Sequence, residues 1–211
     1  MKKIVFISIA VLFMTISANA QLFQYGLKAG VNFSSIAMDD VTGITDGTQV
    51  YDLVTGETVA GYQFGLMTRL KVAMVFVQPE LYFNTTGGTV EQVIQGGATE
   101  VLNVKFNRID IPVLVGVKLG PARLNAGPVG SIVISSVNEL TEAISEIESV
   151  QSGMTFGFQA GIGVDLFSKL TVDARYEGSL SKYADTFTVG GSDYNLDARP
   201  NAWILALGYW F

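Results

Sequence analysis

The chain has 211 residues, enough for one domain of ordinary size, of which 49% are hydrophobic, and its formal net charge is −6. It contains neither Cys nor His, which excludes disulfides, thiol catalysis and imidazole acid–base catalysis and argues against most zinc sites. The negative charge argues against a nucleic-acid partner, and we expect neither an enzyme nor a bound cofactor or metal.

The amino terminus has the pattern of a secretory signal peptide. Lys2 and Lys3 supply positive charge, residues 4–16 form an apolar stretch, and Ala18-Asn19-Ala20 is a small-x-small cleavage site. We expect cleavage after Ala20, so that residues 1–20 are a signal peptide and residues 21–211 form one exported domain. An uncleaved signal anchor is the alternative. Beyond this stretch, no apolar run approaches the roughly 20 residues that a transmembrane helix needs.

Alternation of large apolar residues with small or polar residues predicts eight β-strands. In chain order they cover residues 24–34, 60–70, 73–85, 102–118, 122–135, 154–167, 169–181 and 203–211. In the fourth segment Phe106 is out of phase with Ile109, which predicts a β-bulge near Asn107.

The connectors between these segments alternate in length. Residues 71–72, 119–121 and 168 are tight turns, whereas residues 35–59, 86–101, 136–153 and 182–199 are long. Tight and long connectors therefore leave opposite ends of the sheet, as the short periplasmic turns and longer outer loops of transmembrane barrels do. The sequence predicts an all-β fold, an eight-stranded antiparallel up-and-down transmembrane β-barrel of the bacterial outer membrane.

The two faces of the predicted strands differ in size and charge. One face is almost wholly apolar and aromatic, and we expect it to meet lipid, while the face with glycine and ions points inward. An eight-stranded barrel is just wide enough for side chains to fill it, and unpaired buried charges are costly. We therefore expect a structural ion-pair network inside the barrel, formed by Lys28, Arg69, Glu80, Asp110, Arg123, Asp165, Asp173, Arg175 and Glu177. An ion path or proton relay and an enzyme site are the alternatives for this cluster.

Aromatic residues concentrate near the strand ends, which favours aromatic girdles at the two membrane interfaces over the general preference of aromatics for strands. This set comprises Tyr25, Phe33, Tyr62, Phe83, Phe156, Tyr176, Trp203, Tyr209 and Phe211.

The long connectors hold 14 of the 19 acidic residues. A solvated acidic face is the simplest interpretation, and calcium binding at Asp39-Asp40 or at Glu139, Glu142 and Glu146 is the alternative. Leu140, Ile144 and Ile147 have helical spacing, which predicts a short helix over residues 139–149. The glycines of residues 157–163 look like a phosphate-binding loop but lie inside an alternating strand, so we expect them to make room inside a narrow barrel.

Several motifs, in this order and spacing, resemble the PorT-like outer-membrane β-barrel family of Bacteroidetes-type bacteria. These motifs are residues 25–33 (YGLKAGVNF), 79–82 (PELY), 109–114 (IDIPVL), 125–128 (NAGP), 173–176 (DARY) and 207–211 (LGYWF). The resemblance implies an eight-stranded outer-membrane barrel, and a carboxy-terminal insertion signal comprising Trp203, Tyr209 and Phe211 for the barrel-assembly machinery. The family's namesake is associated with type IX protein secretion, and its pattern supplies no catalytic residues.

We therefore expect a barrel surrounded by outer-membrane lipid that acts through its acidic extracellular loops in binding, adhesion or assembly and secretion. The sequence does not identify the extracellular or secretion-system partner. A small-solute or ion channel is one alternative, and a lipid-modifying barrel enzyme, against which the absence of His argues, is another.

Overall fold

The computed structural model describes residues 22–37, 41–46, 49–94, 97, 99–138, 154–181, 184–189 and 192–211. The expected signal peptide, the expected helix over 139–149 and both candidate calcium clusters lie outside the described residues. Among the residues that are described, there is no helix with the length and apolar character that crossing a bilayer requires.

The described part of the chain contains eleven β-strands. They are β1 (Phe23–Ala37), β2 (Val41–Asp46), β3 (Gln49–Thr55), β4 (Val59–Val72), β5 (Val75–Ile94), β6 (Thr99–Leu119), β7 (Ala122–Asn138), β8 (Met154–Leu166), β9 (Leu170–Ser179), β10 (Ala184–Val189) and β11 (Ser192–Trp210).

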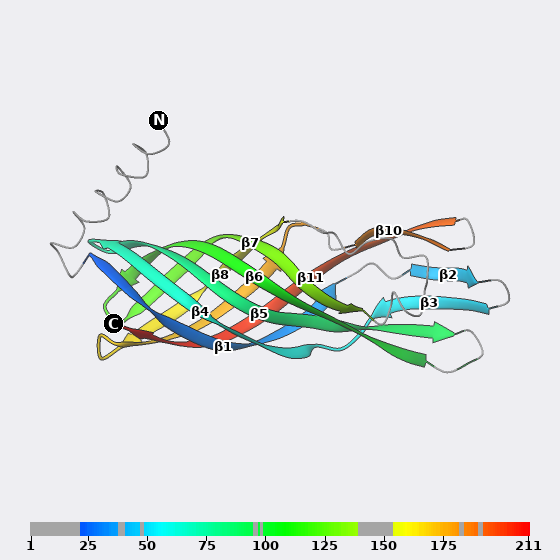
Figure 1. The fold of residues 1–211 in the computed structure, drawn as a ribbon, viewed down its shortest axis with the longest axis horizontal. Coiled ribbons are helices and arrows are strands. Elements are labelled where there is room, and N and C mark those ends of the chain that lie inside the picture. The colour runs from blue at the N-terminus through cyan, green and yellow to red at the C-terminus, as the bar shows by residue number, and fades with distance from the viewer. Residues whose placement is uncertain are drawn as a thin grey trace, which may run out of the picture.

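Eight of these strands close a barrel. The antiparallel order β4-β1-β11-β9-β8-β7-β6-β5 returns to β4 through the β4–β5 pairing, and the first and last strands meet along their length, for example at Ala29 opposite Leu207. A closed ring leaves no unpaired sheet edge in the membrane-sized part of the fold. The predicted eight-stranded up-and-down barrel is confirmed, and Figure 1 shows its strands crossing the long axis at a common tilt.

The three tight turns lie at one end of the barrel (Figure 1). They fall at residues 73–74, 120–121 and 167–169, so the first lies two residues later than expected. Lys71 and Val72 still pair with Phe76 and Val75, and the turn itself uses Ala73 at a φ of 55°. No Gly or Asn marks this left-handed position, which is why turn chemistry could not locate it.

The two faces of the sheet point as predicted, with the apolar face outward and the charged face inward. On the outside, Leu205 and Phe158 are 52% and 40% exposed, whereas Arg123 and Arg175 inside are 2% and 1% exposed. The terminal strand β11 follows the same rule, with Leu207 outside and Trp210 buried inside. The outer surface of the barrel is therefore apolar, and the charged side chains occupy its interior, which we call the lumen.

Several strands continue well past the barrel at the long-connector end. β5, β6 and β11 have 20, 21 and 19 residues, and β2, β3 and β10 form within segments expected to be loops. β3 pairs with the far end of β5, from Tyr51 opposite Ile94 to Thr55 opposite Val90. We call β2, β3 and residues 86–94 and 99–106 the β-extension (Figure 1, right). The expectation of plain loops is wrong here because these stretches find strand partners in one another.

The β-bulge expected in β6 lies on the neighbouring strand instead. Between Asn107 and Arg108 the partner on β7 changes from Ser135 to Val133, so Ile134 is the extra residue. Phe106 and Arg108 are both buried in the same phase as Asp110. The lumen changes from ionic to apolar along this strand, and that change, not a shift in phase, made Phe106 look misplaced.

Candidate functional site

Glu80 of β5 is the centre of the ion network in the lumen. Its two carboxylate oxygens accept a two-pronged pair of bonds from Arg175 of β9, at 2.6 and 2.9 Å, and Lys28 of β1 lies 3.2 Å from one of them. Asp173 of β9 takes the other side of Lys28 at 2.6 Å. Three strands are thus joined across the middle of the barrel by buried, paired charges, the form in which buried ions are tolerated.

A second group lies toward the tight-turn end around Asp165 of β8. Its carboxylate contacts Arg69 at 2.8 Å, Arg123 at 2.9 Å and Lys118 at 2.5 Å. Arg123 also contacts Asp173 at 2.7 Å and so connects this group to the central one. Lys118 is the most exposed member, and it marks the mouth of the lumen.

A third group lies toward the long-connector end. Arg108 of β6 contacts Asp110 at 3.0 Å and also pairs with Glu177 of β9. Arg108, like Lys118, belongs to the network but is not in the predicted set. Arg108 was left out because the phase change assumed near Asn107 removed it from the inward face. Its even spacing with Asp110 was the signal that could have found it.

Amide side chains connect the third group to its neighbours. Gln159 donates to Glu177 at 2.7 Å and accepts from Arg175 at 3.3 Å, while Asn84 donates to Asp110 at 2.6 Å. The polar network is therefore continuous from the mouth of the lumen at the tight-turn end, through the central group, to the third group toward the long-connector end.

Toward the long-connector end of the lumen, hydrogen bonds join β1 to β5, although β4 separates these two strands in the sheet. Asn32 donates to the side chain of Asn84 and to the carbonyl of Thr85, each at 2.9 Å. Ser34 donates to the carbonyl of Gly87 at 2.7 Å and accepts from its amide at 2.9 Å. These bonds draw two non-adjacent strands together and narrow the barrel above the ions.

At the opposite end, Arg69 lies between two aromatic rings. Its guanidinium carbon is 4.5 Å from the ring centre of Trp210 and 5.0 Å from that of Phe76, and its Nε donates to Gln78 at 2.7 Å. Cation–π contacts of this kind gain strength when they are desolvated. The terminal strand is therefore fixed to β4 and β5 from the inside, which the inward position of Trp210 alone did not reveal.

The structure places all the charged residues expected inside the barrel on its inner surface. Eight of them are buried and Asp165 lies at the mouth. The set is Lys28, Arg69, Glu80, Asp110, Arg123, Asp165, Asp173, Arg175 and Glu177.

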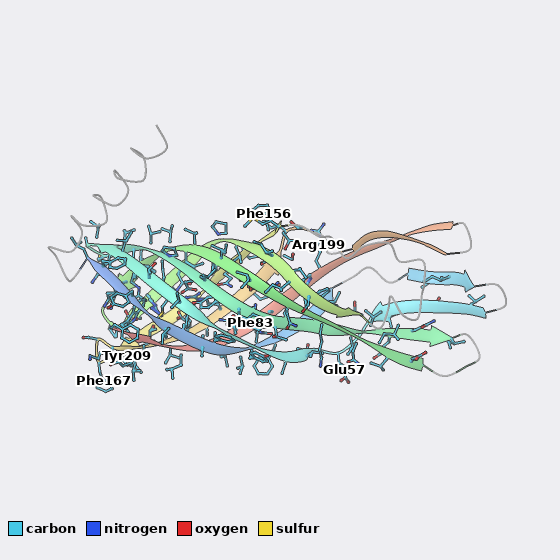
Figure 2. The ribbon with its side chains drawn as sticks, viewed as in Figure 1. Glu57, Phe83, Phe156, Phe167, Arg199 and Tyr209 are labelled. Atoms are coloured by element: carbon cyan, nitrogen blue, oxygen red, sulfur yellow. The ribbon has the colours of Figure 1, made fainter. Side chains whose placement is uncertain are left out.

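The aromatic residues expected in the insertion signal lie on the outside. Tyr209 and Phe211 pack edge-to-face with ring centres 5.6 Å apart, and Phe211 also contacts Tyr25 at 5.4 Å. Trp203 lies toward the other end and packs edge-on against Tyr176 at 5.2 Å. Figure 2 shows Tyr209 with Phe167 at the tight-turn end and Phe83 and Phe156 further along the barrel.

The β-extension has an apolar core of its own. Ile44, Val90, Leu102 and Phe106 are buried there, and Ile36 at the adjoining end of β1 is buried as well. Gly88 permits this packing, because a Cβ at that position would lie 2.9 Å from the backbone nitrogen of Ile36. The strands above the barrel therefore form a packed sheet.

Acidic residues are divided cleanly between two places. The five acids outside the long connectors are Glu80, Asp110, Asp165, Asp173 and Glu177, all of them in the lumen, and all the others fall in the long connectors. Within the described ranges, no three acidic side chains are arranged so that they could hold a metal ion.

Comparisons with known proteins agree with this geometry. The family model described as outer membrane protein beta-barrel domain matches residues 19–185, and a search of curated proteins finds no match. The structure is similar to that of Neisserial surface protein A, at 9% identity, with 89% of this chain and 97% of that one covered and a TM-score of 0.50, which shows the fold alone.

Two further similar structures are Ail, the attachment invasion locus protein of Yersinia pestis, and OprG from Pseudomonas aeruginosa. Ail is 14% identical over 89% of this chain and 98% of its own, with a TM-score of 0.47. OprG is 12% identical over 88% and 95%, with a TM-score of 0.45. On the family match, which covers most of its length, the chain belongs to the outer membrane protein beta-barrel domain family and is an integral β-barrel protein of the bacterial outer membrane.

Proposed function

We propose that this barrel anchors a binding surface outside the cell, and that the β-extension is that surface. The observation that carries the proposal is the buried core of the β-extension, in which Ile44, Leu102 and Phe106 are excluded from solvent. Long connectors of outer-membrane barrels face outward. A connector that only had to return the chain to the membrane would need no packed core.

The construction of the β-extension supports a rigid platform. Between β3 and β4, the amide of Gly56 donates to the carbonyl of Thr89 at 3.0 Å. The amide of Glu57 donates to the side-chain hydroxyl of Thr89 at 2.6 Å. The break between the two strands is thereby held against β5. Preorganised surfaces lose less conformational entropy on binding, which favours recognition of a macromolecule.

The distribution of charge also supports a binding role for the long connectors. The lumen balances its ions internally, so the net negative charge of the protein is carried by the long connectors, including Asp52, Glu57, Glu91 and Glu100 of the described part. We infer a partner with a complementary basic surface, whose association slows as salt screens the attraction.

The contents of the lumen argue against the channel alternative. Arg175, Glu80 and Lys28 fill the middle of the barrel with mutually paired, buried side chains. We expect such a plug to block solutes, because moving its members apart would expose unpaired charges. We expect silent planar bilayers after insertion of the purified barrel; regular single-channel steps would contradict this.

A photo-crosslinking experiment in intact cells tests the binding proposal. A photoreactive residue replaces Val101, which is exposed on β6 of the β-extension, and the matched control carries it at Leu205 on the lipid face. We expect a discrete protein adduct from position 101 that weakens with added salt, and only lipid adducts from position 205. Equal adducts at both positions would refute a specific outer surface.

A shortened barrel provides the functional arm of the same test. Residues 87–105 are replaced by a two-residue turn that joins β5 to β6 near the Thr86–Phe106 pair. We expect a barrel that assembles normally but no longer forms the adduct from a second photoreactive site at Glu57. An unchanged adduct would show that the β-extension is not the binding surface.

Three finer assignments are part of this proposal. The PorT-like resemblance of the motifs points to a Bacteroidetes-type barrel, in which a role in secretion would be one form of partner binding. Lys2, Lys3 and the Ala18–Ala20 site support export with cleavage after Ala20. The outward aromatic residues of the last strand support recognition by the barrel-assembly machinery.

We also propose that the protein is not an enzyme. The absence of His and Cys supports this, and so does the engagement of the lumen carboxylates in ion pairs, because a carboxylate held by cations is a poor general base. Unchanged lipid A and phospholipid profiles in a deletion strain are the expected result.

A further inference from the structure

A groove crosses the outer surface of β4, β1 and β11 in the half of the barrel near the tight turns. Ala29 forms its floor, because it is a small side chain between its larger cross-strand partners Phe64 and Leu207. Leu27 and Tyr209 form the wall nearest the turns. The groove is open on its outer side and has a volume of about 570 Å³, within the roughly 300–1,000 Å³ range of ligand pockets.

The groove is continuous with the lipid-facing surface of the barrel. Leu27, Leu66 and Leu207 are each more than half exposed around it, on the apolar band that faces the membrane. Its side-chain walls are apolar, and Lys28, the charged residue of this segment, turns its side chain into the lumen. An acyl chain has the shape and polarity to occupy such a space.

A cation lies against Tyr209, one of the residues that line the groove. Lys169, in the turn between β8 and β9, donates from Nζ to the hydroxyl of Tyr209 at 3.3 Å and lies 5.7 Å from the centre of its ring. Leu170, the next residue, lines the groove. Figure 2 shows Tyr209 and Phe167 together at this end, where the tight turns meet the periplasmic interface and lipid headgroups lie.

We propose that the groove binds one anionic glycerophospholipid of the periplasmic leaflet. An acyl chain lies over Ala29 between Phe64 and Leu207, and the phosphate accepts hydrogen bonds from Lys169 Nζ and the Tyr209 hydroxyl. The apolar groove explains why a chain is held in one place, and the lysine explains why an anionic headgroup is preferred.

Native mass spectrometry of the intact barrel tests the site. The protein is refolded in detergent and titrated with phosphatidylglycerol or phosphatidylcholine of the same acyl composition. We expect one retained lipid, with phosphatidylglycerol favoured by about fivefold, the preference that one lysine near an anionic surface supplies.

Two variants separate the parts of the site, and each has a matched control. Ala29→Phe fills the groove and should abolish retention of both lipids, whereas Val31→Phe places the same ring two residues along the same outward face and should leave retention unchanged. Lys169→Gln should remove the preference for phosphatidylglycerol while keeping retention, and Lys71→Gln, at the same end but outside the groove, should keep the preference. Ala29→Ile serves if Ala29→Phe fails to give a heat-modifiable barrel.

Three results would overturn the proposal. Equal lipid retention in Ala29→Phe and wild type would show that the groove holds no specific chain. An unchanged phosphatidylglycerol preference in Lys169→Gln would remove the headgroup assignment. A barrel that dimerises, with Ala29→Phe abolishing the dimer and no lipid retained by the wild-type protein, would show that a second copy covers the groove.

Discussion

Replacing Glu80 by Gln is the sharpest test of the ion network. Glu80 accepts hydrogen bonds from Lys28, from Gln78 and twice from Arg175, so one change removes the charge that pairs with two buried cations. Of the carboxylates in the described part of the chain, Asp173 alone remains paired with both, at 2.6 Å from Lys28 and 3.5 Å from Arg175.

The size of the effect follows from the charge balance. Among the described residues, the lumen proper contains five paired cations and five anions, with Lys118 at its mouth. Glu80→Gln leaves one buried cation uncompensated at nearly constant volume, and breaking a buried pair in this way costs about 3–5 kcal/mol. We expect the free energy of unfolding in lipid vesicles, measured by urea titration and gel mobility, to fall by that amount.

A double variant distinguishes charge balance from local packing. Lys28→Met combined with Glu80→Gln restores equal numbers of lumen cations and anions, so its destabilisation should be smaller than the sum of the two single effects. Glu100→Gln, an exposed carboxylate on β6, is the control and should stay within about 0.5 kcal/mol of wild type. If Glu80→Gln were as stable as Glu100→Gln, the network would not be what holds the lumen together.

Three further perturbations address the lipid face and the terminal strand. Leu207→Arg should destabilise the barrel by about 2–4 kcal/mol in vesicles, while Val101→Arg, on the β-extension beyond the bilayer, should change the unfolding free energy little. Equal effects would show that Leu207 does not face lipid. Trp210→Ala removes a buried ring that contacts Arg69 and should lower the free energy of unfolding by about 3–5 kcal/mol in the same urea titration. A loss of less than about 1 kcal/mol would show that the contact between Trp210 and Arg69 does not hold the terminal strand in place. Deleting Phe211 should lower the yield of heat-modifiable barrel in cells, and a normal yield would argue against its role in insertion.

The alternation of residue size and charge determined which side of each strand faces lipid. Side chains on a strand point to opposite faces with a period of two, so Leu205 and Arg175 could be assigned to opposite sides without knowledge of any partner strand. The alternating connector lengths then implied an up-and-down barrel, because neighbouring strands in sequence become neighbours in space. These are local properties, and local properties can be read from a single sequence.

Pairing partners inside the lumen were decided by the closed barrel alone. Arg175 and Glu80 are 95 residues apart, and they meet because the registers of eight strands close around the ring. Alternation says that both side chains point inward but does not say at what height, because height depends on the stagger accumulated around the barrel. The same reason hid the contact between Arg69 and Trp210.

The β-extension also depended on tertiary structure. Its Val- and Thr-rich stretches have strand propensity, but whether a connector becomes a sheet depends on finding a partner with unpaired backbone groups. β3 pairs with residues 90–94 of β5. That part of β5 extends beyond the barrel as a strand because it also pairs with β6. The sequence by itself determined the barrel and its two faces, and the three-dimensional closure of the chain decided which charges meet and which connectors become structure.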